Sequence, residues 1–91
     1  MYLHLGQDTV VRTSSIIGIF DMDTSTISKT TRDYLAACEK SGRVVNVSME
    51  LPKSFVLCQE GKKGRPTVYI SQISSSTLLK RSGFVESLGN V

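Results

Sequence analysis

The chain has 91 residues with 11 Lys and Arg, 8 Asp and Glu and a formal net charge of +3, which is enough for one small domain with a thin core. No apolar run reaches the roughly 20 residues of a membrane-spanning helix, and the N-terminus lacks the basic-then-apolar order of a signal peptide. These features predict a cytoplasmic protein with no membrane partner, and the small size favours a binding surface over the deep pocket of an enzyme.

Six short runs rich in Ile, Val, Tyr and Phe predict β-strands, because such residues favour extended backbone and turn residues bound each run. The runs cover residues 2–5, 9–12, 16–20, 44–47, 54–58 and 67–70. The connections over residues 6–8, 13–15 and 61–64 are short enough for antiparallel pairing. An antiparallel meander is therefore the simplest arrangement.

Residues 25–41 are predicted to form a helix, because buried-type side chains recur there at spacings of three and four. They form one stripe of Ile27, Thr31, Tyr34, Leu35 and Cys38. The opposite face is polar and carries Lys29, Thr30, Arg32, Asp33 and Lys40. We therefore expect the helix to pack one side against the sheet and to expose the other side to water.

Residues at both ends of this helix suit their positions. Thr24 or Ser25 can cap the start, and Asp21 and Asp23 lie where the helix dipole favours negative charge. Gly42 can end the helix in the left-handed conformation. The two aspartates could in principle hold a metal ion, but carboxylates before a helix more often cap it.

A shorter helix is predicted to start within residues 74–77 and to run to Gly83, with serines as caps. Residues 82–91 have a weak pattern of mixed polarity, so we expect a flexible C-terminal tail or a segment ordered only by a neighbouring subunit. Residues 1–81 then form the single domain. The predicted fold class is α+β: a small antiparallel β-sheet of about five to six short strands, one main α-helix packed on it, and a short C-terminal helix.

The residues needed for catalysis or metal binding are not arranged in any recognisable set. Cys38 and Cys58 have no CxxC spacing and no neighbouring His, so they predict two buried free thiols and neither a zinc site nor a redox dithiol. His4 is the only histidine and has no carboxylate or cysteine near it in sequence. No GxSxG or SxxK motif activates a serine. The sequence therefore predicts no enzyme, no metal ion and no cofactor.

The cationic side chains are concentrated in the second half of the chain. Residues 1–51 hold five basic and six acidic side chains, whereas residues 52–91 hold six basic and two acidic side chains. The six cations are Lys53, Lys62, Lys63, Arg65, Lys80 and Arg81. A one-sided positive field suits a polyanion such as double-stranded DNA, although many ordinary domains share the asymmetry.

A glycine-flanked turn, EGKKGRP over residues 60–66, presents three of these cations. It is not a phosphate-binding P-loop, because that motif lies between a strand and a helix and here a strand follows. Gly64-Arg65-Pro66 resembles the core of a hook whose extended arginine enters the minor groove of A·T-rich DNA. A solvated turn is the alternative interpretation. For Lys80 and Arg81, the favourable effect of positive charge at a helix C-terminus is a sufficient explanation.

Four segments carry a resemblance to a known family: MYLHLG, VVRTSSIIGIFD, LPKSF and VYISQISSSTLLKR. They resemble the RemA and RemB family of extracellular-matrix (biofilm) regulators of Gram-positive bacteria, over roughly residues 1–81. The resemblance implies a small α+β protomer that assembles into a closed ring and binds DNA by backbone contacts as a transcriptional regulator of matrix genes.

The chain departs from the RemA branch at its arginines. RemA-like sequences carry a run of arginines just before the strand that begins here near Ser54, and Lys53 is the one basic residue that falls on that run. An arginine between the second and third strands falls at Ser15, with Arg12 three residues earlier. Either Arg12, Lys53 and the 62–65 turn supply the charge instead, or this branch binds DNA weakly and acts through another protein.

The main hypothesis is therefore a homo-oligomer whose repeated basic rim neutralises DNA phosphates with little direct reading of bases. The candidate DNA-binding residues are Arg12, Lys53, Lys62, Lys63, Arg65, Lys80 and Arg81. The second hypothesis is a regulator of the same fold that co-assembles with a RemA-like partner and does not touch DNA itself.

Overall fold

The computed structural model describes residues 1–22, 28–61 and 64–82. Within these ranges the order of elements is β1 (Tyr2–Gly6), β2 (Thr9–Arg12), the 3-10 turn η1 (Thr13–Ser15), β3 (Ile16–Asp21), α1 (Lys29–Lys40), β4 (Val44–Asn46), β5 (Ser54–Cys58), β6 (Thr67–Ser71) and α2 (Ser75–Ser82). The six predicted strands, the main helix and the C-terminal helix are all present, so the α+β prediction is confirmed.

The predicted meander is wrong, because the strands divide between two sheets. β1 and β2 form an antiparallel ribbon, and the other four strands form a sheet in the order β3-β5-β6-β4. β5 lies between β3 and β6 and is antiparallel to both, whereas β4 runs parallel to β6. The segment that contains α1 is long enough to carry the chain from one edge of the sheet to the other, which a prediction based on short connections does not anticipate.

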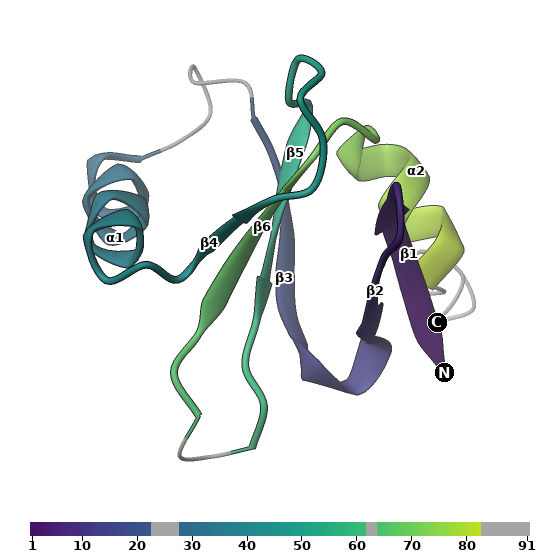
Figure 1. Ribbon diagram of the computed structural model, residues 1–91, viewed down its shortest axis with the longest axis horizontal. Coiled ribbons are helices and arrows are strands. Elements are labelled where there is room, and N and C mark those ends of the chain that lie inside the picture. Colours follow the sequence, from purple (N-terminus) through teal and green to yellow (C-terminus); the bar gives the residue numbers. More distant parts are fainter. Residues whose placement is uncertain (23–27, 62–63, 83–91) are drawn as a thin grey trace.

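The four-stranded sheet separates two layers, with α1 on one face and the β1–β2 ribbon and α2 on the other (Figure 1). Val56 and Cys58 of β5 belong to a buried cluster with Leu3, Leu5, Val11, Val47 and Leu78. Phe55 belongs to a second cluster with Cys38 and Val68. The alternation of side chains along β5 thus supplies both clusters from one strand.

α1 begins four residues later than predicted and has a different cap. Ser28 is the N-cap, and its Oγ accepts a hydrogen bond of 3.2 Å from the backbone N–H of Thr31. The caps predicted from sequence, Thr24 and Ser25, lie outside the described residues, as do Asp23 and Ile27. Asp21 ends β3 and is not in the first turn of the helix.

The predicted end of α1 is confirmed at Gly42, whose φ of 71° is in the left-handed region. The backbone N–H of Gly42 donates to the carbonyl oxygen of Glu39, and that of Arg43 donates to the carbonyl oxygen of Cys38. These two bonds satisfy carbonyl groups of the last turn. They also direct the chain into β4. Among the described residues, neither helix has the length and apolar character needed to cross a membrane.

Candidate nucleic-acid interface

Five of the seven candidate DNA-binding residues lie within the described ranges, and all five are exposed: Arg12, Lys53, Arg65, Lys80 and Arg81. Lys62 and Lys63 lie outside the described residues. The five do not form one contiguous rim on a single protomer. They lie in separate places around the fold.

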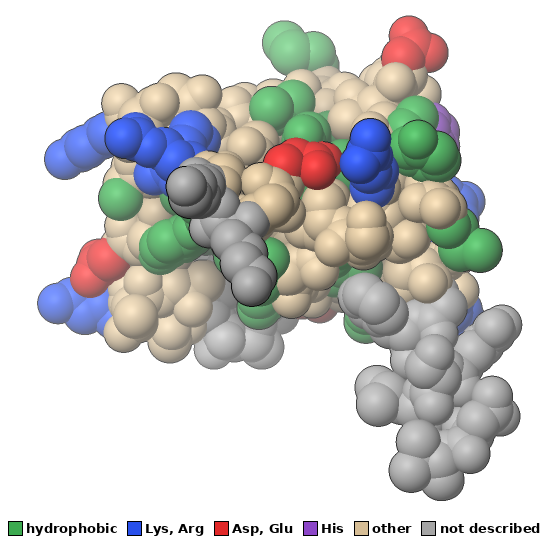
Figure 2. Space-filling view, turned by 90° about the horizontal axis from the view of Figure 1, so that it is seen from below, with side chains coloured by type: hydrophobic (Ala, Val, Ile, Leu, Met, Phe, Trp, Pro, Cys, Tyr) green, Lys and Arg blue, Asp and Glu red, His purple; other side chains and the backbone are tan. Residues whose placement is uncertain are grey.

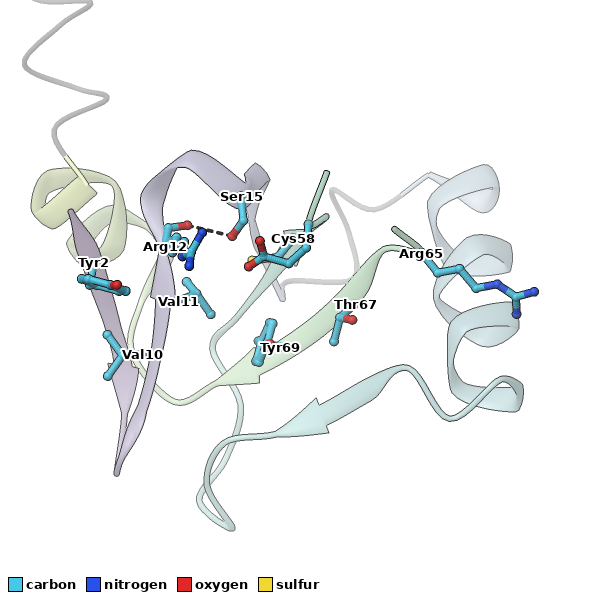
Figure 3. A pocket seen from close by; sticks show the side chains of 10 residues that line it. Tyr2, Val10, Val11, Arg12, Ser15, Cys58, Arg65, Thr67 and Tyr69 are labelled. Atoms are coloured by element: carbon cyan, nitrogen blue, oxygen red, sulfur yellow. Dashed lines mark hydrogen bonds between the residues drawn. The ribbon is translucent and has the colours of Figure 1, made fainter. Parts of the chain in front are cut away.

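Arg12 lines a hollow of about 320 Å³ between the ribbon and the adjoining ends of β5 and β6 (Figure 3). It is the last residue of β2, and its carbonyl oxygen accepts a hydrogen bond of 2.7 Å from Ser15 Oγ. Ser15 is buried and in turn accepts at its own carbonyl oxygen from the backbone N–H of Gln59. The backbone that carries Arg12 is therefore fixed against β5, while its guanidinium remains accessible.

Burial raises the pKa of two other groups that line this hollow. Burial raises the pKa of the Cys58 thiol, the negative charge of Glu60 raises it further, and a hydrogen bond with Ser15 partly opposes the rise. Burial also raises the pKa of Tyr69, with smaller contributions from Cys58 and Glu60. The charged side chains that line the hollow are consequently Arg12, Glu60 and Arg65.

Arg65 forms part of the wall of this hollow, but its guanidinium points away from Arg12 and toward α1 (Figure 3). The backbone on both sides of Arg65 is fixed by side chains. Gln59 Nε2 donates a hydrogen bond of 2.7 Å to the carbonyl oxygen of Gly64, and Arg43 Nη1 donates one of 3.0 Å to that of Pro66. The exposed Arg65 side chain thus projects from a rigid base.

Gly64 is required in this turn because a side chain has no room there. A Cβ atom on Gly64 would lie 2.0 Å from the carbonyl oxygen of Glu60. The glycine that precedes Arg65 in the sequence motif therefore has a steric role in shaping the turn. This role exists whether or not the turn contacts DNA.

Lys53 lies at the opposite end of the β3–β5 pair from Arg12, since Ser54 pairs with Asp21 and Cys58 pairs with Ile16. Its backbone N–H donates to Ser71, and its carbonyl oxygen accepts from Met22, both at 2.9 Å. Its side chain lines a hollow of about 410 Å³ with Asp21, Met22, Pro52, Ser74, Ser75 and Ser76. Lys53 therefore lies beside the first turn of α2, where the backbone N–H of Thr77 donates to Ser74 Oγ.

Lys80 and Arg81 occupy the last turn of α2, where their charge also complements the helix dipole. Both are exposed, because α2 packs its other side against β1 and β3 through Leu78. With Arg12, Lys53 and Arg65, these two residues place exposed cations at several positions around the protomer.

The sequence pattern assigns the cations of α1 to a helix face that is exposed to water. The structure shows these cations in a more concentrated group than that assignment implied. Figure 2 shows Lys and Arg side chains gathered over α1. Lys29, Arg32 and Lys40 are exposed on this helix, and Arg65 points toward it (Figure 3). Thr30, Thr31 and Tyr34 of α1 line one hollow with Gln59 and Pro66, and the sequence pattern does not reveal that these distant segments lie together.

The remaining candidate groups have structural roles. His4 Nε2 lies 2.6 Å from the carbonyl oxygen of Gln7, within the ribbon. Cys38 and Cys58 are both free and buried, which confirms the prediction for the two thiols. Among the residues that the structure describes, no three His, Cys, Asp or Glu side chains gather as metal ligands. The arrangement of exposed cations is suited to binding an anion.

Two comparisons with known proteins both find extracellular matrix regulatory proteins. The family model described as RemA-like, extracellular matrix regulatory protein A-like, matches residues 2–81 of the chain. The chain is also 38% identical over 85 residues to extracellular matrix regulatory protein B of Bacillus subtilis (strain 168), and the alignment covers 93% of this chain and 94% of that protein.

Proposed function

Because the chain belongs to the RemA-like family of extracellular matrix regulatory proteins, we propose that it regulates matrix genes by binding double-stranded DNA as a ring-like homo-oligomer in the cytoplasm. The family is one of regulators, and the proposal adds the mechanism by which this chain regulates. Phosphate contacts from exposed Lys and Arg side chains would supply the affinity.

The observation that carries the proposal is the availability of the candidate cations. All five candidates within the described ranges are exposed to solvent. Arg12 and Lys53 project from opposite ends of the β3–β5 pair, on backbone that hydrogen bonds fix in place. In a ring, each protomer would repeat both contacts, so a modest charge per chain becomes a large charge per particle.

Two features support assembly. β3 lies at an edge of the four-stranded sheet, and an uncovered edge favours pairing with another chain. Large apolar side chains are also exposed on β3, with Ile17 at 54% and Phe20 at 39% exposure. Such surface is typical of protomers whose faces become buried on association.

The experiment that tests the proposal combines a mobility shift on matrix-gene promoter DNA with light scattering of the free protein. We expect a mass well above the 10.0 kDa of one chain and a shift that weakens steeply as salt rises. A monomer at micromolar concentration would contradict the ring. An oligomer that fails to shift DNA at low salt would contradict DNA binding alone.

A second candidate function is a regulator that co-assembles with a RemA-like partner without touching DNA itself. Ser15 favours it, because this residue stands where RemA-like sequences have an arginine and its buried side chain cannot reach a phosphate. In that case the chain alone would leave promoter DNA unshifted, and it would alter the shift produced by the partner.

A further inference from the structure

We propose that an apolar groove between α1 and β3 receives residues 49–51 of a second copy of the chain. The inference rests on the oligomer of the proposed function and identifies the two surfaces that meet in it. It follows from four properties of the described residues: an uncovered groove, a projecting apolar segment, their relative positions and their charges.

The groove exists because α1 covers one side of its sheet face and leaves the β3 side open. α1 packs against β6, and its Cys38 joins Phe55 and Val68 in the buried cluster beneath it. The remaining space is about 420 Å³ and is lined by Ile17, Phe20, Thr30, Thr31, Tyr34, Leu35, Phe55, Leu57, Gln59 and Pro66. Most of this lining is apolar, which makes it costly to leave in water.

Aromatic side chains shape the floor of the groove. The rings of Phe20 and Phe55 stack with their centroids 4.9 Å apart and an interplanar angle of 17°. Gly18 permits this arrangement, because a Cβ atom there would lie 2.7 Å from the Phe20 ring. Even so, Phe20 and Tyr34 each remain 39% exposed, and Ile17 is more exposed still. The described residues therefore form the groove without filling it.

The projecting segment lies between β4 and β5 and carries two nearly fully exposed apolar side chains. Met49 is 102% exposed and Leu51 is 82% exposed, with the exposed Glu50 between them. The backbone N–H of Glu50 donates to Ser48 Oγ at 3.1 Å. Backbone hydrogen bonds also join both ends of the segment to β6. The N–H of Val47 donates to the carbonyl oxygen of Ile70, and the N–H of Lys53 donates to that of Ser71. The segment is presented on a fixed base, which reduces the entropy lost on binding.

The segment and the groove lie in different parts of the protomer. Residues 46–50 line a hollow with Gln7, at the turn of the β1–β2 ribbon, whereas the groove lies beside α1 on the other face of the sheet. Figure 1 shows the β4–β5 connection at one end of the sheet and α1 at its side. A contact between two such different surfaces is head-to-tail, and contacts of this kind generate rings when the rotation closes.

The charges around the groove complement the segment. Four cations adjoin the lining residues in sequence or by contact, namely Lys29, Arg32, Arg43 and Arg65, against the three carboxylates of Asp21, Asp33 and Glu60. This rim has a net positive charge. Glu50 is the charged residue of the segment, so docking of its apolar neighbours brings a carboxylate to a positive rim.

The first experiment measures the mass of three variants by analytical ultracentrifugation over a range of concentrations. Ile17→Asp places a charge in the groove, and Met49→Asp with Leu51→Asp places charges on the segment. Each is expected to weaken self-association by at least about 30-fold, as expected when a central interface residue is replaced. Val10→Asp is the matched control, because Val10 is a similarly exposed strand residue outside both surfaces, and it should keep the wild-type mass.

The second experiment mixes the groove variant and the segment variant in equal amounts. Each lacks one surface and retains the other, so the mixture should form a heterodimer held by one intact contact and should not grow further. This outcome requires both variants to be folded, which distinguishes a disrupted interface from a disrupted fold. Variants that keep the wild-type mass, or a mixture that stays monomeric, would overturn the contact while leaving the ring of the proposed function intact. A monomeric wild type would overturn both.

Discussion

Ser71 Oγ donates a buried hydrogen bond of 2.6 Å to the carbonyl oxygen of Leu5, and this contact joins β6 of the sheet to β1 of the ribbon. The same oxygen accepts a hydrogen bond of 3.0 Å from the backbone N–H of Ile73, just before α2. Ser71 is completely buried. One hydroxyl therefore connects the sheet, the ribbon and the entry to the C-terminal helix.

Replacing Ser71 with Ala should lower the free energy of unfolding by about 1–3 kcal/mol, because it removes the partner of the buried Leu5 carbonyl and of the partly buried Ile73 N–H. Urea denaturation monitored by circular dichroism measures the change. Ser14→Ala is the control, since Ser14 is exposed, and it should remain within about 0.5 kcal/mol of wild type. Equal stability of Ser71→Ala and wild type would contradict the role assigned to this hydroxyl.

Ser28→Ala should destabilise the fold by about 0.5–2 kcal/mol, because it removes the N-cap hydrogen bond to Thr31. Ser28→Asp should restore most of the stability, since aspartate also caps and its charge suits the helix dipole. The same urea titration distinguishes the two variants. If alanine and aspartate behave alike, the cap does not contribute as the structure implies.

Stability should fall as the pH rises above about 9.0, the ordinary pKa of the Cys58 thiol. Burial raises that pKa in the folded chain, so the unfolded chain loses its proton first and gains stability relative to the folded chain. The contribution is complete below the unfolded pKa and disappears as the pH rises through the folded value. Tyr69, whose pKa is also raised from 10.0, should extend the decline.

The alkaline decline is measured by urea denaturation under reducing conditions at pH 8 and at higher values. Cys58→Ala should show a shallower decline than wild type, although its poorer packing lowers stability at every pH. If wild type and Cys58→Ala lose stability equally as the pH rises, groups other than the Cys58 thiol cause the decline.

Lys53→Ala should weaken binding to all DNA sequences alike and should flatten the dependence of log affinity on log salt. Each phosphate that is no longer neutralised lowers the slope by about 0.9, and in a ring the substitution acts once in every protomer. Arg12→Ala should act in the same way. Ser76→Ala is the control, because Ser76 lines the same hollow as Lys53 without carrying a charge. Unchanged slopes for both cation variants would contradict phosphate binding at these positions.

Arg65→Ala should chiefly reduce the preference for A·T-rich DNA, if the rigid 64–66 turn enters a minor groove. A narrow minor groove concentrates negative potential where a guanidinium would lie. Titrations against A·T-rich and G·C-rich duplexes at matched salt measure this preference, and Arg65→Lys tests whether charge alone suffices. An equal reduction in affinity for both duplexes would make Arg65 an ordinary phosphate contact.

The six strands could be predicted from sequence, because each one is a local pattern of residues. All six predicted strands are present in the structure. Their order could not be predicted, because β4 reaches its parallel place beside β6 through a long connection whose path local patterns do not specify. The start of α1 was placed too early for a similar reason. Several Ser and Thr residues precede this helix, and any of them can cap a helix, so composition alone did not select Ser28.

The candidate site was predictable as a set of residues but not as a surface. The sequence identified Arg12, Lys53 and Arg65 as exposed cations, and the structure places all three at the surface. It did not indicate that Lys53 would lie beside α2 or that Arg65 would point toward α1, because both relationships join segments distant in the chain. Direct contact of these residues with DNA remains a prediction.

The packing of Leu78 against Leu3 and Leu5 has a consequence for synthesis of the chain. A ribosome releases the β1–β2 ribbon first and α2 last of the described elements, so the buried face of the ribbon lacks its cover until α2 has been synthesised. A two-stranded ribbon is marginally stable by itself. Nascent chains that stall before residue 75 would therefore expose this apolar face and depend on chaperones to avoid association.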